Sequence, residues 1–236
     1  MLSNYWSFIV ILFVSAGLSI LSRKLTIAGA LTGGVIAWLI FIGAGYTGIT
    51  MLATFFILGS AATSWKIHLK QQLGFAEKNK GRRTTAQVLA NGSVPAIMGL
   101  LKWLYPAYAN LFVVMMAASL ASATADTLSS ELGTVYGRKF YNIITFKKAT
   151  RGLDGVISVE GTIIGIMGSA LIAIIYSIGF GYTSNFFRII IAGTTGNIAD
   201  SLLGAILERR NYIHNNAVNF LNTLIAAITA LLLYFA

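Results

Sequence analysis

The residues best suited to chemistry lie in one stretch, Ser122-Ala-Thr-Ala-Asp126-Thr-Leu-Ser-Ser-Glu131-Leu-Gly133. It places two carboxylates and several hydroxyl side chains at the end of an apolar segment that begins near Leu111. Helical spacings of three and four residues form a small polar stripe with Asp126 in its middle: Ser119, Ser122, Asp126, and Ser129 or Ser130. A carboxylate is costly near a bilayer, so we expect this stripe to face protein or water and to have a function.

A second acidic stretch resembles the first. Ala199-Asp200-Ser-Leu202 echoes Ala125-Asp126-Thr-Leu128, and both lie in apolar segments of the same predicted orientation. This pattern indicates a weak internal repeat about an axis along the membrane normal, in which Asp126 and Asp200 face each other. Two such carboxylates suit one or two Mg²⁺ ions, because Mg²⁺ prefers oxygen ligands and keeps waters that substrate phosphates can replace.

Two further motifs each allow two interpretations. Gln87 and Asn91 share one helix face, with Arg83 one turn earlier. They are either amides that bond a neighbouring helix or a polar ladder leading inward from a phosphate-binding arginine. Asp154 lies between Gly152 and Gly155 before a predicted helix. That pattern fits a backbone that approaches a phosphate, and it equally fits an ordinary turn with an N-cap.

The composition requires a membrane bundle to position these residues. The 236 residues are 56% hydrophobic and only 10% charged, whereas soluble domains have about 25% charged residues. The chain has no cysteine, which excludes disulfides and thiolate metal sites. We therefore predict an all-α, polytopic transmembrane bundle, with one domain over residues 1–236 and cytoplasmic loops at about 66–86, 129–156 and 208–215. Apolar windows of about 20 residues predict eight spans, at approximately 5–21, 27–43, 48–65, 87–105, 110–128, 157–178, 187–207 and 216–235.

The charges of the predicted loops fall on one side. Eight spans leave only Lys102 and Arg188 of the 17 lysines and arginines on the other side. By the positive-inside rule the basic side is cytoplasmic and both termini face outside, which suits a prokaryotic plasma membrane. All seven carboxylates fall on this same side or at the span ends beside it, as a site for a metal and phosphates requires. Topology and anionic lipids account for most of the net charge of +10. Nucleic acid is not an expected partner, because the basic residues are split among loops.

Several motifs occur together in the order typical of one family: Gln87-Val-Leu-Ala-Asn91-Gly92, Asp126-Thr, Glu131-Leu-Gly133, Gly152-Leu-Asp154-Gly155, Ser158, Gly161-Thr162, Asp200-Ser-Leu-Leu-Gly204 and Asn219. The chain resembles, from about Lys24 to its end, a mostly uncharacterised integral-membrane family that includes the plant plastid phytyl-phosphate kinase. It departs from the usual pattern at Leu153, where a small polar residue is common.

The resemblance implies phosphoryl transfer. A nucleoside triphosphate, CTP or ATP, would phosphorylate a membrane-embedded isoprenyl monophosphate similar to phytyl phosphate, giving the diphosphate. In this interpretation Asp126, Glu131 and Asp200 hold Mg²⁺, and Asp154 helps to place the metal or the nucleotide. The residues expected to bind substrate or its phosphates are Arg83, Gln87, Asn91, Lys147, Lys148, Arg151, Ser158 and Asn219.

Other functions remain open. Nucleotidyl transfer to a lipid phosphate, or phosphorylation of a polyprenol, would also use membrane aspartates and Mg²⁺. An ion-coupled transporter would use glycine-broken helices and intramembrane carboxylates, although such sites lie near the midplane and these acids lie near one surface. No glycine-rich Walker loop is present, so nucleotide recognition would be of another kind. The sequence determines neither the prenyl length nor the oligomeric state.

Overall fold

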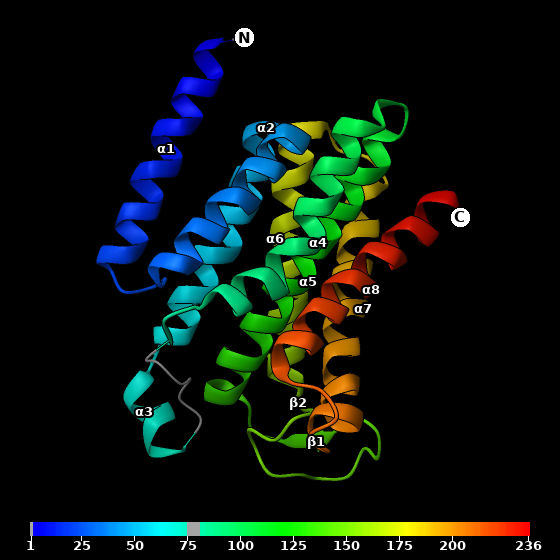
Figure 1. Cartoon of the computed structure of the whole chain (residues 1–236). Helices are drawn as coiled ribbons and strands as arrows, with labels where there is room; N and C mark the ends of the chain where they lie inside the picture. Colours follow the sequence, from blue (N-terminus) through cyan, green and yellow to red (C-terminus); the bar gives the residue numbers. More distant parts are fainter. Residues whose placement is uncertain (1, 75–80) are drawn as a thin grey trace.

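The chain forms a bundle of long helices that run up and down between two ends (Figure 1). The computed structural model describes residues 2–74 and 81–236, with side chains from residue 5 onward. The all-α prediction is confirmed by these helices: α1 (Leu2–Leu21), α2 (Ile27–Ser64), α3 (Ile67–Gln72), α4 (Thr85–Leu104), the 3₁₀ turn η2 (Pro106–Tyr108), α5 (Ala109–Tyr136), α6 (Val159–Phe180), α7 (Asn185–Leu203), the π-helical turn η3 (Gly204–Glu208) and α8 (Asn215–Phe235).

Helix α2 is folded into two antiparallel arms. The fold lies at Gly45, whose φ of 57° and ψ of −146° belong to a region that glycine adopts readily. The two ends of α2 therefore meet, and Lys24 Nζ donates a hydrogen bond of 2.5 Å to Ser64 Oγ. The predicted spans 27–43 and 48–65 are thus the two arms of one element (Figure 1). The other six predicted spans correspond to α1, α4, α5, α6, α7 and α8.

Helix α5 is the centre of the bundle. It contacts α2, α4, α6, α7 and α8, and its residues from Val113 to Ala125 are buried without a break. Many of these are alanine, serine or threonine, whose small side chains let neighbouring helices approach closely. Because α5 is enclosed on all sides, the end of its polar stripe faces protein or a cavity.

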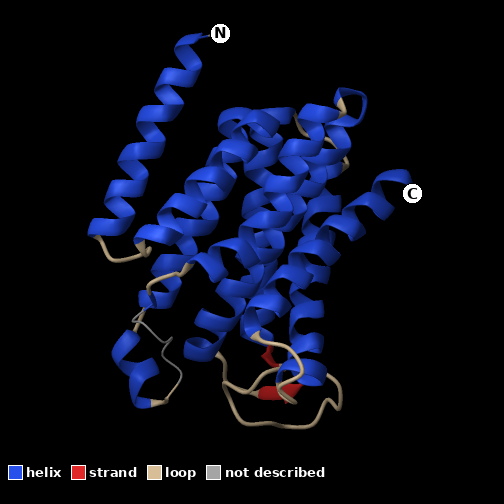
Figure 2. Cartoon of the chain, viewed as in Figure 1, coloured by secondary structure: helices blue, strands red, loops and turns tan. Residues whose placement is uncertain are grey.

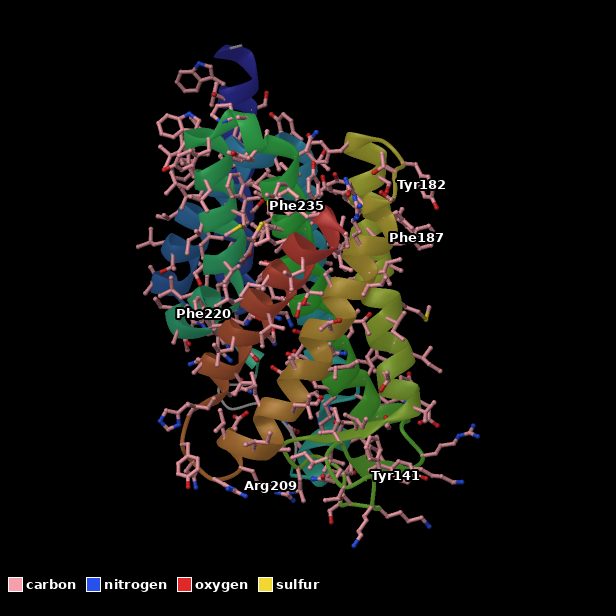
Figure 3. The ribbon with its side chains drawn as sticks, turned by 90° about the vertical axis from the view of Figure 1, so that its right-hand side faces the viewer. Tyr141, Tyr182, Phe187, Arg209, Phe220 and Phe235 are labelled. Carbon is pink, nitrogen blue, oxygen red and sulfur yellow. The ribbon has the colours of Figure 1, made fainter. Side chains whose placement is uncertain are left out.

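The outer surface of the bundle is apolar. Phe13, Leu31 and Ile178 are 72%, 71% and 81% exposed, and a soluble protein does not expose apolar side chains over such an area. Among the described residues, five helices are long and apolar enough to cross a membrane: α2, α5 with η2, α6, α7 with η3, and α8. Helix α1 provides a shorter apolar helix, and α4 is more polar because it carries Gln87 and Asn91. Figure 3 shows Phe187 and Tyr182 toward one end and Arg209 and Tyr141 at the other.

The loops that carry most basic residues gather at a single end of the bundle. Strands β1 (Phe140–Asn142) and β2 (Val156–Ser158) form a small antiparallel pair there, with Phe140 opposite Ser158. Figure 2 shows these strands below the ends of the helices, and the N-terminus at the far end. The segment from Gly137 to Ser158 is called the hairpin below.

Candidate functional site

A cavity of about 750 Å³ lies at the end of the bundle that carries the basic loops. Helices α3 to α8 and the hairpin all contribute to its wall. Nine of the predicted site residues line it: Arg83, Gln87, Asn91, Asp126, Glu131, Asp154, Ser158, Asp200 and Asn219. The fold therefore brings together residues that are spread along the sequence from Arg83 to Asn219. Their roles stay predictions.

Asp126 and Asp200 are direct neighbours. Their carboxyl groups lie within hydrogen-bonding reach of one another, Asp126 from α5 and Asp200 from α7. Two neighbouring carboxylates repel each other unless a proton or a cation offsets their charge. The two halves of the predicted repeat thus place their acids together, as the sequence comparison between Ala125–Leu128 and Ala199–Leu202 indicates.

The pair is held by a polar relay through three helices. Asn222 Nδ2 on α8 donates to Asp200 Oδ1 at 2.7 Å, and Ser122 Oγ on α5 donates to Asn222 Oδ1 at 3.2 Å. Both Asn222 and Ser122 are fully buried. Gly196 on α7 allows this approach, because a Cβ there would overlap Ser122 Oγ. Since a buried amide with both ends bonded has a fixed orientation, the relay sets the position of the Asp200 carboxylate.

Glu131 has a different partner. Lys70 Nζ on α3 lies 2.5 Å from Glu131 Oε2 and also donates to the carbonyl oxygens of Ala62, at 2.7 Å, and Thr63. Lys70 is 1% exposed. The ammonium group has three N–H donors, so these contacts use all of them. In this structure Glu131 is therefore neutralised by a lysine from outside the bundle.

The separation of Glu131 from Asp126 follows from the length of α5. The two acids would converge only if the helix ended near Ser130 and the chain turned at Gly133, but α5 continues without a break to Tyr136. Five residues along an unbroken helix rotate a side chain by about 140°. Gly133 serves a close contact instead, since a Cβ there would lie 2.9 Å from Gly161 Cα on α6. The predicted loop at 129–156 accordingly begins later, after Tyr136.

The polar residues at the start of α4 have specific partners. Gln87 Oε1 accepts a hydrogen bond of 2.9 Å from Thr84 N, which completes a capping box at the helix N-terminus. Asn91 Nδ2 donates to the Gln87 carbonyl oxygen at 3.1 Å, while the buried Asn91 Oδ1 has no partner among the described residues. The Arg83 guanidinium lies 4.8 Å from the ring of Phe55 and reaches the cavity. Gln87 thus has a structural role beside any binding role.

Asp154 and Ser158, four residues apart, both line the cavity. Ser158 is the N-cap of α6, and its Oγ accepts from Gly161 N at 3.1 Å. Asp154 is exposed and belongs to a turn before β2, so it is not the cap. Partial burial raises the pKa of Asp154, and Arg209 opposes this shift. Gly155 packs against Ala205 of the π-helical turn η3, and π-helical turns are frequent at functional sites.

Lys147, Lys148 and Arg151 lie on the hairpin but do not line the cavity. The Arg151 guanidinium stacks 5.1 Å from the centre of the Phe140 ring, and Phe140 does line it. These three cations are therefore not part of the described cavity wall, although Arg151 contacts a residue that is. Asn219 Nδ2 contacts Asn215 Oδ1 at 3.4 Å, and both residues line the cavity from α8.

The carboxylates of the site do not form a ready-made metal cluster. Across residues 2–74 and 81–236, no three histidine or acidic side chains come close enough to hold a metal by themselves. The predicted set Asp126, Glu131 and Asp200 is therefore not assembled here, because Glu131 is bound to Lys70. The remaining pair still fits Mg²⁺, which is commonly bound by one or two carboxylates together with waters and substrate phosphates.

The cavity also contains polar residues outside the predicted set, among them Lys70, Asn197, Asn215 and Glu208. Asn197 Oδ1 accepts from Ser129 Oγ at 3.0 Å, and its position one turn before Asp200 is a signal the sequence offers. Glu208 lies about two helical turns after Asp200, on the same helix face. Lys70 offers no such signal, since it meets Glu131 across 61 residues of chain.

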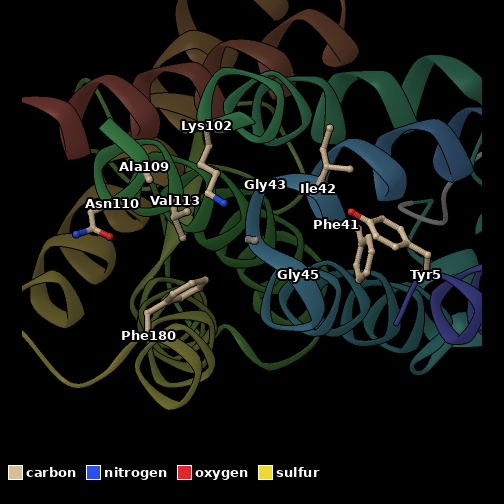
Figure 4. A pocket seen from close by; sticks show the side chains of 11 residues that line it. Tyr5, Phe41, Ile42, Gly43, Gly45, Lys102, Ala109, Asn110, Val113 and Phe180 are labelled. Carbon is tan, nitrogen blue, oxygen red and sulfur yellow. The ribbon is translucent and has the colours of Figure 1, made fainter. Parts of the chain in front are cut away.

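A second cavity, of about 360 Å³, provides a contrast. It lies at the opposite end, beside the fold of α2 at Gly45, and its labelled residues include Lys102, Tyr5 and Phe180 (Figure 4). No carboxylate lines it. The acidic chemistry of the described chain is therefore confined to the end with the basic loops.

A polytopic helical bundle with an acidic cavity at one end defines an integral membrane protein with a polar site near one surface. The chain belongs to the family described as integral membrane protein DUF92, whose model matches residues 10–227. This confirms the family resemblance inferred from the motifs.

The chain is similar to several known relatives of this family. An uncharacterized membrane protein of Methanocaldococcus jannaschii is 31% identical over 90% of this chain and 87% of its own length. Protein VTE6, chloroplastic, of Arabidopsis thaliana is 31% identical over 88% of this chain and 63% of its own length. An uncharacterized membrane protein of Synechocystis is 30% identical over 84% of this chain and 77% of its own length. No solved structure matches the chain.

Proposed function

We propose that the chain is an isoprenyl-phosphate kinase. It would transfer the terminal phosphoryl group of a nucleoside triphosphate, CTP or ATP, to a membrane-embedded prenyl monophosphate similar to phytyl phosphate. The observation that carries the proposal is the Asp126–Asp200 pair, built from two matching motifs and placed in a cavity large enough for a nucleotide and a phosphate headgroup. Membership of a family that includes the plant plastid phytyl-phosphate kinase supports the substrate class.

The charge of the cavity supports a requirement for a divalent cation. Five carboxylates line the described wall against two basic side chains, which leaves a formal charge of −3: Asp126, Glu131, Asp154, Asp200 and Glu208 against Lys70 and Arg83. Such a wall repels phosphates unless cations are bound with them. Mg²⁺ held by Asp126 and Asp200 would supply Lewis-acid neutralisation of the phosphoryl oxygens.

The protein's own part in the reaction is binding and orientation. An oxygen of the lipid monophosphate attacks the terminal phosphorus of the nucleotide, and the bond from that phosphorus to the bridging oxygen breaks to release the nucleoside diphosphate. The acceptor is already an anion at neutral pH, so no general base is needed. Arg83 contributes a fixed positive charge at the wall, and the relay through Asn222 keeps the Asp200 carboxylate in place.

One assay tests the proposal. Purified protein given Mg²⁺, phytyl monophosphate and either ATP or CTP should form phytyl diphosphate and the matching nucleoside diphosphate, and chelation of Mg²⁺ should abolish product. Release of pyrophosphate would show nucleotidyl transfer. Nucleotide-independent accumulation of a solute in proteoliposomes, with no lipid product, would identify a carrier. Either result would contradict the kinase proposal.

We also propose that the cavity end faces the cytoplasm and that both termini face outside. Because the chain has no cysteine, single cysteines report topology directly. Tyr212 and Tyr182 form a matched pair, since they are 70% and 69% exposed. Tyr182 lies at the end of the bundle opposite Arg209 (Figure 3), and Tyr212 follows Arg209 by three residues. A membrane-impermeant maleimide added to intact bacterial cells should label Tyr182→Cys and leave Tyr212→Cys unlabelled until the cells are opened. The reverse pattern would invert the proposed orientation.

A further inference from the structure

The hairpin has two chemically different faces. Six of its apolar side chains line the cavity: Phe140, Ile143, Phe146, Leu153, Val156 and Ile157. Its basic side chains do not: Arg138, Lys139, Lys147, Lys148 and Arg151. The cavity wall therefore combines these apolar side chains with carboxylates, which are Asp126 and Asp200 on the helices and Asp154 on the hairpin itself. A ligand that fills the cavity must combine a flat or apolar group with a metal-binding anionic group.

Phe146 is the unusual member of the apolar wall. Its side chain lines the cavity and is 76% exposed, whereas Ile143 is buried and the ring of Phe140 is covered by Arg151. The backbone of Phe146 has a φ of 52°, which is costly for a bulky residue. The turn that imposes this conformation is well built, because Asn142 Oδ1 accepts from Ile144 N and Thr145 N at 3.0 Å each. The exposed ring is thus held at the cavity by a defined structure.

The position of this wall selects one occupant. The hairpin lies beyond the helix ends, on the water side of the bundle, whereas a prenyl chain belongs among the apolar helices (Figure 2). A nucleobase arrives from water, has a flat π-face and carries its phosphates toward bound cations. Aromatic side chains stack on any base, and Phe146 offers an exposed ring in the cavity wall.

We infer that the hairpin forms the nucleobase subsite of the cavity, with Phe146 as the ring on which the base of the nucleoside triphosphate stacks. This inference rests on the proposed kinase function and supplies the nucleotide-recognition element that the missing Walker loop leaves open. The subsite would contact only the flat face of the base, which all nucleobases have, so both ATP and CTP should bind. The phosphates of the nucleotide then extend toward Asp126 and Asp200.

The test compares nucleotides with inorganic tripolyphosphate, which lacks a base. With Mg²⁺ present, ATP, CTP and tripolyphosphate each displace the fluorescent nucleotide mant-ATP from the purified full chain. The wild type should bind ATP and CTP about tenfold more tightly than tripolyphosphate. Phe146→Ala should remove most of this preference, and Phe146→Trp should keep it. Ile144→Ala is the matched control, because Ile144 lies two residues away, is 47% exposed and does not line the cavity.

The outcomes separate the subsite from the proposed function. If the wild type binds no nucleotide, the kinase proposal fails and the subsite fails with it. If the wild type prefers nucleotides and Phe146→Ala retains the full preference, only the subsite is wrong. If Phe146→Ala raises the KM for phytyl monophosphate and leaves nucleotide binding unchanged, the wall belongs to the lipid substrate and the inference is overturned.

Discussion

Asp126→Asn and Asp200→Asn are each expected to lower phosphoryl transfer by about 100-fold or more while leaving the protein folded in detergent. The magnitude is that of removing one preorganised electrostatic group from a charged transition state. Asparagine keeps the shape of the side chain and the hydrogen bond from Asn222 to position 200, but it removes the negative charge that holds a cation. The measurement is the rate of phytyl diphosphate formation over a range of Mg²⁺ concentrations.

A control variant makes this prediction specific. Glu160→Gln removes a carboxylate from the same end of the bundle, but Glu160 does not line the cavity and only accepts a hydrogen bond of 3.4 Å from Arg138 N. Its activity should stay within a few-fold of wild type. Full activity of both aspartate variants, at every Mg²⁺ concentration, would show that the pair holds no catalytic metal.

Local sequence signals were enough to predict the helices and the gathering of charged residues at one end of the bundle. Apolar length marks a membrane helix wherever the chain crosses, and lysine and arginine mark the loops, so neither needs knowledge of distant contacts. The pairing of Asp126 with Asp200 was also within reach, because the two motifs share residues and predicted orientation. The same window rule separated the two arms of α2, since Gly45 interrupts the apolar run.

The missing parts depend on contacts between distant segments. Strands β1 and β2 have three residues each, too few for an alternating pattern to appear in the sequence. The sequence predicted a turn at Gly133. In the structure, its lack of a side chain instead lets α6 approach α5 closely, and this depends on packing between distant segments. The Lys70–Glu131 contact joins α3 to α5 and has no periodic signature at all. Glu77, one of the seven carboxylates predicted to lie on the basic side, falls outside the described residues.

Replacing Lys70 alone should destabilise the protein strongly. Replacing Glu131 as well should restore the lost stability. Lys70→Met leaves the Glu131 carboxylate, whose side chain is 15% exposed, without its counter-ion. Breaking a buried ion pair from one side costs about 3–5 kcal/mol, whereas replacing both partners by neutral groups is often close to neutral. We therefore expect a marked loss of thermal stability in detergent for Lys70→Met and recovery in Lys70→Met combined with Glu131→Gln. Lys66→Met is the control, because Lys66 is exposed and only lies over the Tyr136 ring.

The same double variant decides the role of Glu131. If Glu131 serves only to pair with Lys70, the double variant should regain activity together with stability, and its Mg²⁺ dependence should match that of wild type. If Glu131 is a third metal ligand, as the sequence motif predicts, the double variant should be stable and still inactive at ordinary Mg²⁺ concentrations. The geometry favours the first result, because Glu131 shares its charge with an ammonium whose other two donors are fixed by the end of α2. Asp126 and Asp200 would then be the carboxylates that hold the metal, which makes the relay through Asn222 more important for activity than any residue of α3.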